Sequence, residues 1–198
     1  MNQEIEIEFK NLLVKEEFQF LLNEYSLTEN RFTLQQNHYF DTATFDLKSN
    51  GAALRIRHKN GVYTLTLKQP IEEGILETHQ VLTEQQAMGM LSGGTLLDGD
   101  IQNIIKALQI DSAKIVHFGT LETNRAEIHD LDGILVFDHS RYLNQDDYEL
   151  EYEVQDFKHG QEKFLAFLHK HGIPIRTTEN KIKRFFNAKL SSKEVEKI

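Results

Sequence analysis

The feature that most constrains the fold is a strict alternation of charged and apolar residues near the start of the chain, in the segment Glu4-Ile5-Glu6-Ile7-Glu8-Phe9-Lys10. Neighbouring residues of a β-strand point to opposite faces, so this pattern places the charges on one face and the apolar side chains on the other. Segments 53–57, 63–68, 135–138 and 149–154 repeat the pattern. Taken alone, each segment is also typical of a strand with one solvated face.

Like charges at two-residue spacing favour a different interpretation. Arg55 and Arg57 form one such pair, and two glutamate pairs, Glu6 with Glu8 and Glu151 with Glu153, form the others. Side by side on one strand, like charges repel. The repulsion becomes useful if an anion lies against the arginines and a divalent cation against the carboxylates. The pattern therefore predicts a polar interior that binds a charged ligand.

Composition limits the class of protein. A chain of 198 residues with 39% hydrophobic content and no Pro/Gly/Ser-rich linker is expected to form a single domain, 1–198. The net charge of −9 argues against a nucleic-acid partner. The sequence has no long apolar run for a membrane span, no signal peptide pattern and no cysteine, which favours a cytoplasmic protein without a membrane partner. Its nine histidines are scattered and are expected at the surface.

Helices are expected between the strand signals because apolar residues there recur at helical spacing. The expected helices cover 15–27, 83–92, 100–110, 161–171 and 180–197. Strands and helices do not alternate strictly, which favours an antiparallel α+β fold. If the charged faces point inward, the sheet must close into a β-barrel of about eight strands, with the helices packed outside on the apolar faces.

Seven short segments, in order, resemble the CYTH superfamily of triphosphate tunnel metalloenzymes. Glu6-Ile7-Glu8-Phe9-Lys10 resembles the Glu-x-Glu-x-Lys signature of that family. The other six segments are Tyr39-Phe40-Asp41-Thr42, Arg55-Ile56-Arg57, Thr66-Leu67-Lys68, Arg125 with Asp138, Glu151-Tyr152-Glu153, and Asn180-Lys181-Ile182-Lys183-Arg184. One departure is Thr123, where the family often carries a lysine.

The resemblance implies a closed antiparallel eight-stranded tunnel with a charged lumen that binds a small triphosphate together with Mg²⁺ or Mn²⁺. Arginine offers forked bidentate bonds to phosphate and lysine a compact charge, and carboxylates are hard ligands suited to Mg²⁺. The implied substrate-binding residues are Lys10, Arg55, Arg57, Lys68, Arg125, Lys181 and Arg184. The implied metal ligands are Glu6, Glu8, Asp138, Glu151 and Glu153. The triplet Glu149, Glu151, Glu153 also allows an alignment in which Glu149 completes the metal site, but we prefer Glu151 with Glu153 and expect Glu149 at the rim. Glu6, Glu8 and Lys10 are the implied catalytic residues.

The predicted function is metal-dependent hydrolysis of a triphosphate, with inorganic triphosphate favoured because it needs only cations and metal. A class IV adenylate cyclase, a thiamine or nucleoside triphosphatase, and a non-catalytic module that binds polyphosphate or a nucleotide remain alternatives. Metal carboxylates and phosphate-binding cations are both present, which favours catalysis over binding alone. The resemblance also implies a possible homodimer.

Overall fold

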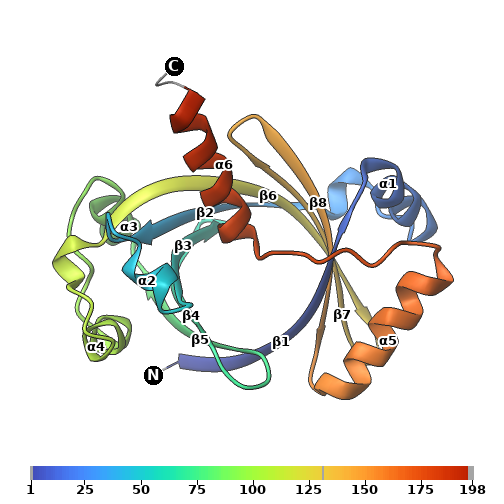
Figure 1. Ribbon diagram of the computed structural model, residues 1–198, viewed down its shortest axis with the longest axis horizontal. Helices are drawn as coiled ribbons and strands as arrows, with labels where there is room; N and C mark the ends of the chain where they lie inside the picture. The colour runs from blue at the N-terminus through green and yellow to red at the C-terminus, as the bar shows by residue number, and fades with distance from the viewer. Residues whose placement is uncertain (1, 131, 196–198) are drawn as a thin grey trace. The chain divides into compact units, whose positions relative to one another are not determined.

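The computed structural model describes residues 2–130 and 132–195, and its core is an antiparallel barrel of strands. The strands hydrogen-bond in the order β1-β5-β4-β3-β2-β6-β7-β8 and close into a barrel (Figure 1). Their bounds are β1 Asn2–Leu13, β2 Thr33–Asp41, β3 Ala53–Lys59, β4 Val62–Pro70, β5 Ile75–Leu82, β6 Val116–Asp130, β7 Gly133–Tyr142 and β8 Gln145–Val154. The predicted α+β fold with a closed eight-stranded barrel is confirmed.

Five of the described helices follow the expected segments with shifted ends, and the short helix α2 was not predicted. The helices are α1 Lys15–Glu24, α2 Asp46–Ser49, α3 Glu84–Leu91, α4 Asp100–Ala107, α5 Phe157–Lys170 and α6 Lys181–Val195, with single 3-10 turns at Glu29–Arg31 and Ser112–Lys114. The side chain of Thr83 caps α3 in a capping box with Gln86. Residues 196 and 197 of the last expected helix lie outside the described residues.

The start of α5 corrects the sequence prediction by four residues. The helix begins at Phe157 because the side chain of Asp156 accepts a hydrogen bond from the backbone N–H of His159, at 2.7 Å. Gly160, in the first turn of this helix, is required for close packing. A Cβ atom there would lie 2.5 Å from Cγ2 of Val154.

The chain divides into two compact units. Unit 1 contains the first strand up to Glu6 and the segment Gln35–Thr120, and unit 2 contains Ile7–Leu34 and the chain from Leu121 onward. The prediction of one domain over 1–198 is not tested by this division and stays a prediction.

In unit 1, the apolar face of the strands packs under α3 and α4 (Figure 1). Leu54 and Ile56 of β3 and Leu65 and Leu67 of β4 are fully buried in this core. The helices contribute Ala87, Met90, Ile101 and Ile105. Since Arg55 and Thr66 have the opposite parity on the same strands, they lie on the face turned away from the helices.

Unit 2 repeats the arrangement with α1 and α5. Phe137 of β7 and Leu150 of β8 are fully buried and belong to the same core as Phe18 of α1 and Phe164 of α5. The opposite parity of β7 and β8 carries Asp138, Glu149 and Glu151. In each unit the helices therefore cover the apolar strand face, and the charged residues occupy the other face.

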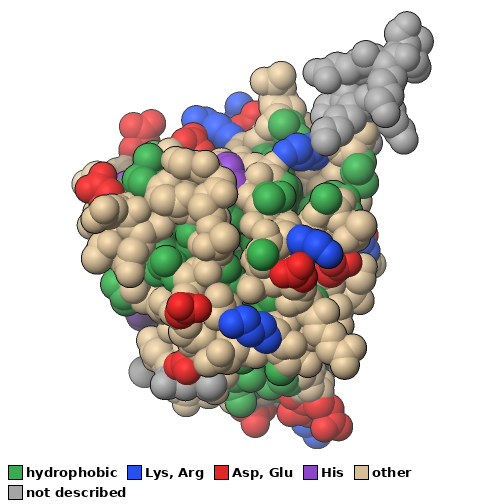
Figure 2. Space-filling model, turned by 90° about the vertical axis from the view of Figure 1, so that its left-hand side faces the viewer, with side chains coloured by type: hydrophobic (Ala, Val, Ile, Leu, Met, Phe, Trp, Pro, Cys, Tyr) green, Lys and Arg blue, Asp and Glu red, His purple; other side chains and the backbone are tan. Residues whose placement is uncertain are grey.

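One face of the molecule can be compared with the negative net charge of the sequence. On the face drawn in Figure 2, the described Lys and Arg side chains stand apart or beside acidic ones, so this face carries no broad basic patch. Among the described residues, every helix is too short or too polar to cross a membrane.

Candidate functional site

Arg125 is the centre of a buried charge cluster in unit 2. Its Nε donates to Asp138 Oδ1 at 2.8 Å and its Nη2 to Asp138 Oδ2 at 2.6 Å, which is a bidentate pair between register neighbours of β6 and β7. Nη2 also donates to Glu151 Oε2 at 2.7 Å, and Nη1 lies 3.6 Å from Glu153 Oε1. The guanidinium is thus fixed with its planar fork against the carboxylates.

Lys181, the first residue of α6, enters the same cluster. Its Nζ lies 2.7 Å from Asp138 Oδ2 and is paired with both Glu149 and Glu151. Burial lowers the pKa of Lys181, but the three carboxylates together raise it well above its ordinary value. The lysine is therefore a permanent cation held against the carboxylate group.

Arg184, one turn further along α6, joins Glu149 to a neighbouring acid. Its Nε donates to Asp147 Oδ2 at 2.7 Å, and its Nη2 lies 2.7 Å from Glu149 Oε2. Burial lowers the pKa of Arg184, but the Glu149 and Asp147 carboxylates outweigh it and raise the pKa above its ordinary value. The spacing of three residues on a helix brings Lys181 and Arg184 to one face, as the sequence predicts.

An extended segment before α6 is fastened to β1 and α1, which sets where α6 begins. Asn11 is buried, its Nδ2 donates to the carbonyl oxygen of Pro174 at 3.1 Å, and its Oδ1 accepts from the N–H of Arg176 at 2.7 Å. The Arg176 guanidinium forms a bidentate pair with Glu17 at 2.8 Å and donates to the carbonyl oxygen of Leu12. These bonds position Lys181, five residues later.

Lys10 and Glu8 of β1 extend the cluster. They form an ion pair with each other, and in the strand register Lys10 lies opposite Glu151 and Glu8 opposite Glu153. Burial lowers the pKa of Lys10, but the charges of Glu8, Glu151 and Glu149 raise it above its ordinary value. Glu8 and Glu153 are like charges on neighbouring strands, and the cations beside them offset the repulsion.

The carboxylates of unit 2 differ sharply in pKa. Burial raises the pKa of Asp138 and Glu151, but Arg125 and Lys181 lower both below their ordinary values. Burial raises the pKa of Glu149 to about 7; Lys181 acts against this shift and the Glu151 charge adds to it. Because burial is the main cause, Glu149 takes up a proton more readily than its two neighbours. Negative charge is in excess here by count, since six of the carboxylates described above surround four cations.

Oxygens of Asp138, Glu149 and Glu151 all lie within 4.8 Å of one another, which is close enough to hold one metal ion. Hard carboxylate oxygens with excess negative charge suit Mg²⁺ or Mn²⁺, so the residues present fit the implied metal. We expected Glu149 at the rim, but it is only 1% exposed and belongs to this group. Among the described residues, Glu153 is not in that group; it lies at the Nη1 side of Arg125.

Unit 1 contains a second charged cluster, around Lys68. Its Nζ donates to Glu6 Oε2 at 2.5 Å and is paired with Glu77, its register neighbour on β5. Burial raises the pKa of Glu77, but the charges of Lys68 and Arg55 outweigh it and bring the pKa to about 2. Glu77 is therefore a permanent anion that holds the cations of this unit.

His79 links Glu77 to the start of β1. Its Nε2 lies 3.0 Å from Glu4 Oε1 and 3.5 Å from Glu77 Oε2, while its Nδ1 hydrogen-bonds the hydroxyl of Thr66 at 3.0 Å. Glu4, Glu77 and His79 form another group with metal-ligand spacing. Arg57 is oriented by the side chain of Asn37, whose Oδ1 accepts from Nε at 3.1 Å.

The structure gathers the predicted site residues into these clusters. Unit 2 holds Glu8, Lys10, Arg125, Asp138, Glu151, Glu153, Lys181 and Arg184, and unit 1 holds Glu6, Arg55, Arg57 and Lys68. Sequence reasoning missed Glu77, His79 and Asp147. Their signal was the parity of β5 and β8, on which each faces the same side as the predicted residues.

Comparison with known proteins gives a consistent family relationship. The family model described as the CYTH domain matches residues 4–186. A Bacillus subtilis protein described as "Putative triphosphatase YjbK" is 50% identical over 192 residues, which cover 97% of this chain and all of that protein.

Two solved structures resemble the chain along most of its length. A Bacillus halodurans protein, described as a "putative adenylate cyclase", is 44% identical with a TM-score of 0.90, and the match covers 94% of this chain and 100% of that one. The Hippeastrum protein HpAC1, described as showing a dominant triphosphatase activity, is 27% identical with a TM-score of 0.77, covering 92% and 96% of the two chains.

Proposed function

The chain belongs to the CYTH domain family, and on that premise we propose that it hydrolyses a triphosphate with the help of Mg²⁺ or Mn²⁺, its substrate being inorganic triphosphate. The carrying observation is the buried cluster of unit 2, in which Arg125 and Lys181 contact the same carboxylates that have metal-ligand spacing. A site that binds a metal triphosphate needs cations for the phosphate oxygens and hard oxygen ligands for the metal, and this cluster supplies both.

The cations bind and orient the phosphate chain. Arg125 presents a fixed fork, and Lys181 and Lys10 are held charged by their carboxylate neighbours. Unit 1, taken by itself, offers phosphate contacts of the same kind from Lys68, Arg55 and Arg57, with Glu77 and Asn37 as supports. Positions fixed before the substrate arrives reduce the cost of orienting it in the transition state.

Carboxylates provide the metal ligands. We propose Glu6, Glu8, Asp138, Glu151 and Glu153 for this role, and the structure adds Glu149 as a candidate. When bound, the metal neutralises charge that develops on the phosphoryl oxygens. Glu6 and Glu8 orient the attacking water, one of the two carboxylates accepts its proton, and Lys10 donates to a phosphoryl oxygen. The new O–P bond forms at the terminal phosphorus while the bridging P–O bond breaks, which releases orthophosphate and pyrophosphate.

The choice of hydrolysis rests on the relatives. YjbK is described as a triphosphatase, and HpAC1 as showing a dominant triphosphatase activity although it also carries a cyclase name. The adenylate cyclase description of the Bacillus halodurans protein makes cyclisation of ATP the second candidate. Inorganic triphosphate is favoured because the charged clusters provide phosphate and metal contacts, and no ring-binding group is needed.

The test is product release from inorganic triphosphate, pyrophosphate, ATP, GTP and thiamine triphosphate, with Mg²⁺, Mn²⁺ or EDTA. We expect orthophosphate from inorganic triphosphate that depends on metal and falls at least about a hundredfold in a Glu6→Gln, Glu8→Gln double variant. Cyclic AMP and pyrophosphate from ATP would instead identify a cyclase. Full turnover in the double variant would refute the assignment of Glu6 and Glu8.

A further inference from the structure

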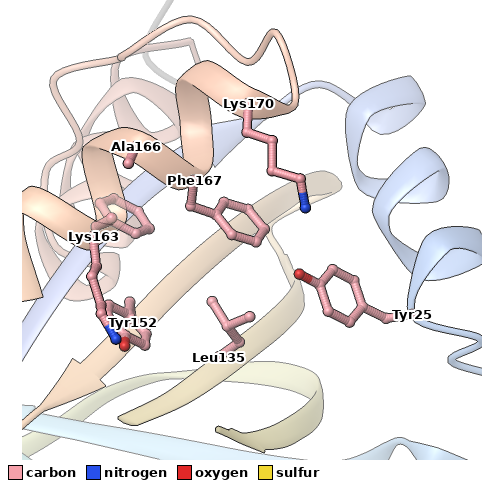
Figure 3. Close-up of a pocket in the computed structure, with 8 residues that line it drawn as sticks. Tyr25, Leu135, Tyr152, Lys163, Ala166, Phe167 and Lys170 are labelled. Carbon is pink, nitrogen blue, oxygen red and sulfur yellow. The ribbon is translucent and has the colours of Figure 1, made fainter. Parts of the chain in front are cut away.

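A pocket of about 300 Å³ lies in unit 2, on the side of β7 and β8 that faces the helices. Figure 3 shows its walls, with Leu135 and Tyr152 on the strands, Tyr25 at the end of α1, and a stripe of α5 above them. Leu135 and Tyr152 are register partners. They have the parity opposite to Asp138 and Glu151, so the pocket is separated from the carboxylate cluster by the thickness of the sheet.

The floor of the pocket is apolar and aromatic. Leu135, Tyr152 and Phe164 are each buried to 6% exposure or less, and the rings of Tyr152 and Phe164 stack at 6.5 Å and 11°. Tyr25 and Phe167 form a second stacked pair, at 6.3 Å and 24°. Such flat walls suit a planar ring, which gains offset or edge contacts in addition to the burial of its surface.

Hydrogen bonds at the ends of α1 and α5 keep the walls in place. His171 directly follows α5, and its side chain is 3% exposed, which corrects the expectation that the histidines lie at the surface. Its Nδ1 contacts the carbonyl oxygen of Phe167 at 2.7 Å and its Nε2 contacts Glu24 Oε1 at 3.2 Å. Because Glu24 precedes Tyr25, this link joins the two aromatic walls.

The charged residues that line the pocket are two lysines, at the two ends of the part of α5 that lines it. Lys163 and Lys170 are two helical turns apart, and Ala166 between them leaves the space open (Figure 3). Lys163 forms an ion pair with Asp132. Among the ion pairs of the described residues none involves Lys170, whose side chain extends toward Tyr25 in Figure 3.

We propose that this pocket is a second binding site, which takes a small planar aromatic molecule carrying one anionic group. The ring lies among Tyr25, Leu135 and Phe167, and the carboxylate, sulfonate or phosphate group pairs with Lys170. A volume of about 300 Å³ is at the lower end of the range for ligand pockets and admits one or two fused rings. The site is independent of the triphosphatase proposal, because no lining residue belongs to the charged clusters.

The experiment uses the aromatic sulfonate 8-anilinonaphthalene-1-sulfonate as a fluorescent probe, titrated into the intact protein. We expect saturable binding with one probe per chain. Lys170→Glu should weaken it about tenfold or more, because a charge-assisted contact becomes repulsive. Ala166→Leu, which fills the pocket at an exposed helix position, should abolish it. Lys158→Glu is the matched control, since this exposed lysine lies in the first turn of the same helix and should leave binding unchanged.

Competition identifies what the pocket recognises. Benzoate should displace the probe at concentrations at which inorganic phosphate does not, since phosphate lacks the ring. The proposal is overturned if the wild type shows no saturable binding, if Lys158→Glu weakens binding as much as Lys170→Glu, or if phosphate competes as well as benzoate. Circular dichroism checks that each variant is folded. If Ala166→Leu is not folded, the comparison of probe binding by Lys170→Glu and by Lys158→Glu still tests the proposal.

Discussion

Replacing Arg125 by Met should destabilise the protein more than the loss of any exposed ion pair. The side chain of Arg125 is 12% exposed, and it contacts Asp138 and Glu151, whose side chains are 0% and 5% exposed. Methionine fills much of the volume of the arginine stem but leaves both carboxylates without the guanidinium. The substitution therefore isolates the charge from the packing.

The magnitude follows from the burial. Removing one partner of a buried pair costs about 3–5 kcal/mol, because a charge is left uncompensated in a low-dielectric site. Two features of the cluster reduce this cost. Lys181 still contacts Asp138 and Glu151, and Asp138 can take up a proton once Arg125 no longer lowers its pKa. We therefore expect a loss of about 3 kcal/mol at pH 7, and a smaller loss at pH 5, where protonation of the carboxylates is easier.

Urea denaturation without substrate or metal measures this difference. The matched control is Arg141→Met on β7, because Arg141 pairs with Asp146 at 3.3 Å and their side chains are 61% and 53% exposed. Exposed pairs contribute about 0–1 kcal/mol. Adding Asp138→Asn to Arg125→Met should recover part of the loss, since it removes the uncompensated charge. The reasoning is refuted if the two arginine variants differ by less than about 0.5 kcal/mol with equal dependence on urea.

Two further predictions concern pH and the position of α6. Burial lowers the pKa of His38 to about 4, and His117 and His58 add to the shift, so the folded state disfavours its charged form. Unfolding free energy should therefore fall as the pH drops from about 6.5 toward 4, by about 1–2 kcal/mol because solvent screens this half-buried ring, and His38→Gln should flatten that profile in thermal melts. Arg176→Met should raise the KM for triphosphate by about threefold to tenfold, because the segment that positions Lys181 loses its bonds to Glu17 and Leu12. Lys183→Met, which removes an exposed pair, is the control and should leave KM unchanged.

The sequence predicted the barrel because the alternation of charged and apolar residues depends only on the two-residue period of a strand. Glu6 and Glu8 lie on one face of β1 and Ile7 and Phe9 on the other, so the polar and apolar faces can be assigned without knowing any contact. The pattern failed on β5. Its helix-facing parity contains Thr78 and Gln80, with Thr78 fully buried, so the strand did not read as charged on one face and apolar on the other. Glu77 and His79 were missed for this reason.

Burial depth and partner choice could not be predicted from parity. Glu149, Glu151 and Glu153 share one face of β8, and the sequence treats them alike. In the structure Glu149 and Glu151 lie under Lys181 and Arg184, while the Glu153 side chain is 28% exposed. The difference arises from α6, whose first turn is placed because the segment just before it is bonded to Asn11 and Glu17, residues far from it in the sequence. Long-range contacts of this kind leave no local pattern.

Under the proposed function, the cluster in unit 2 gives a physical reason for a metal and a triphosphate to bind together. Each cation there is paired with a carboxylate, so a phosphate group that took Arg125 or Lys181 for itself would leave Asp138 or Glu151 uncompensated. A divalent cation on those carboxylates removes that cost, because every buried charge then keeps a partner of opposite sign. Conversely, a metal that bound alone would displace Arg125 or Lys181 from the carboxylate oxygens and leave that buried cation without a partner. The arrangement therefore favours the metal and the triphosphate as one ligand over either of them alone.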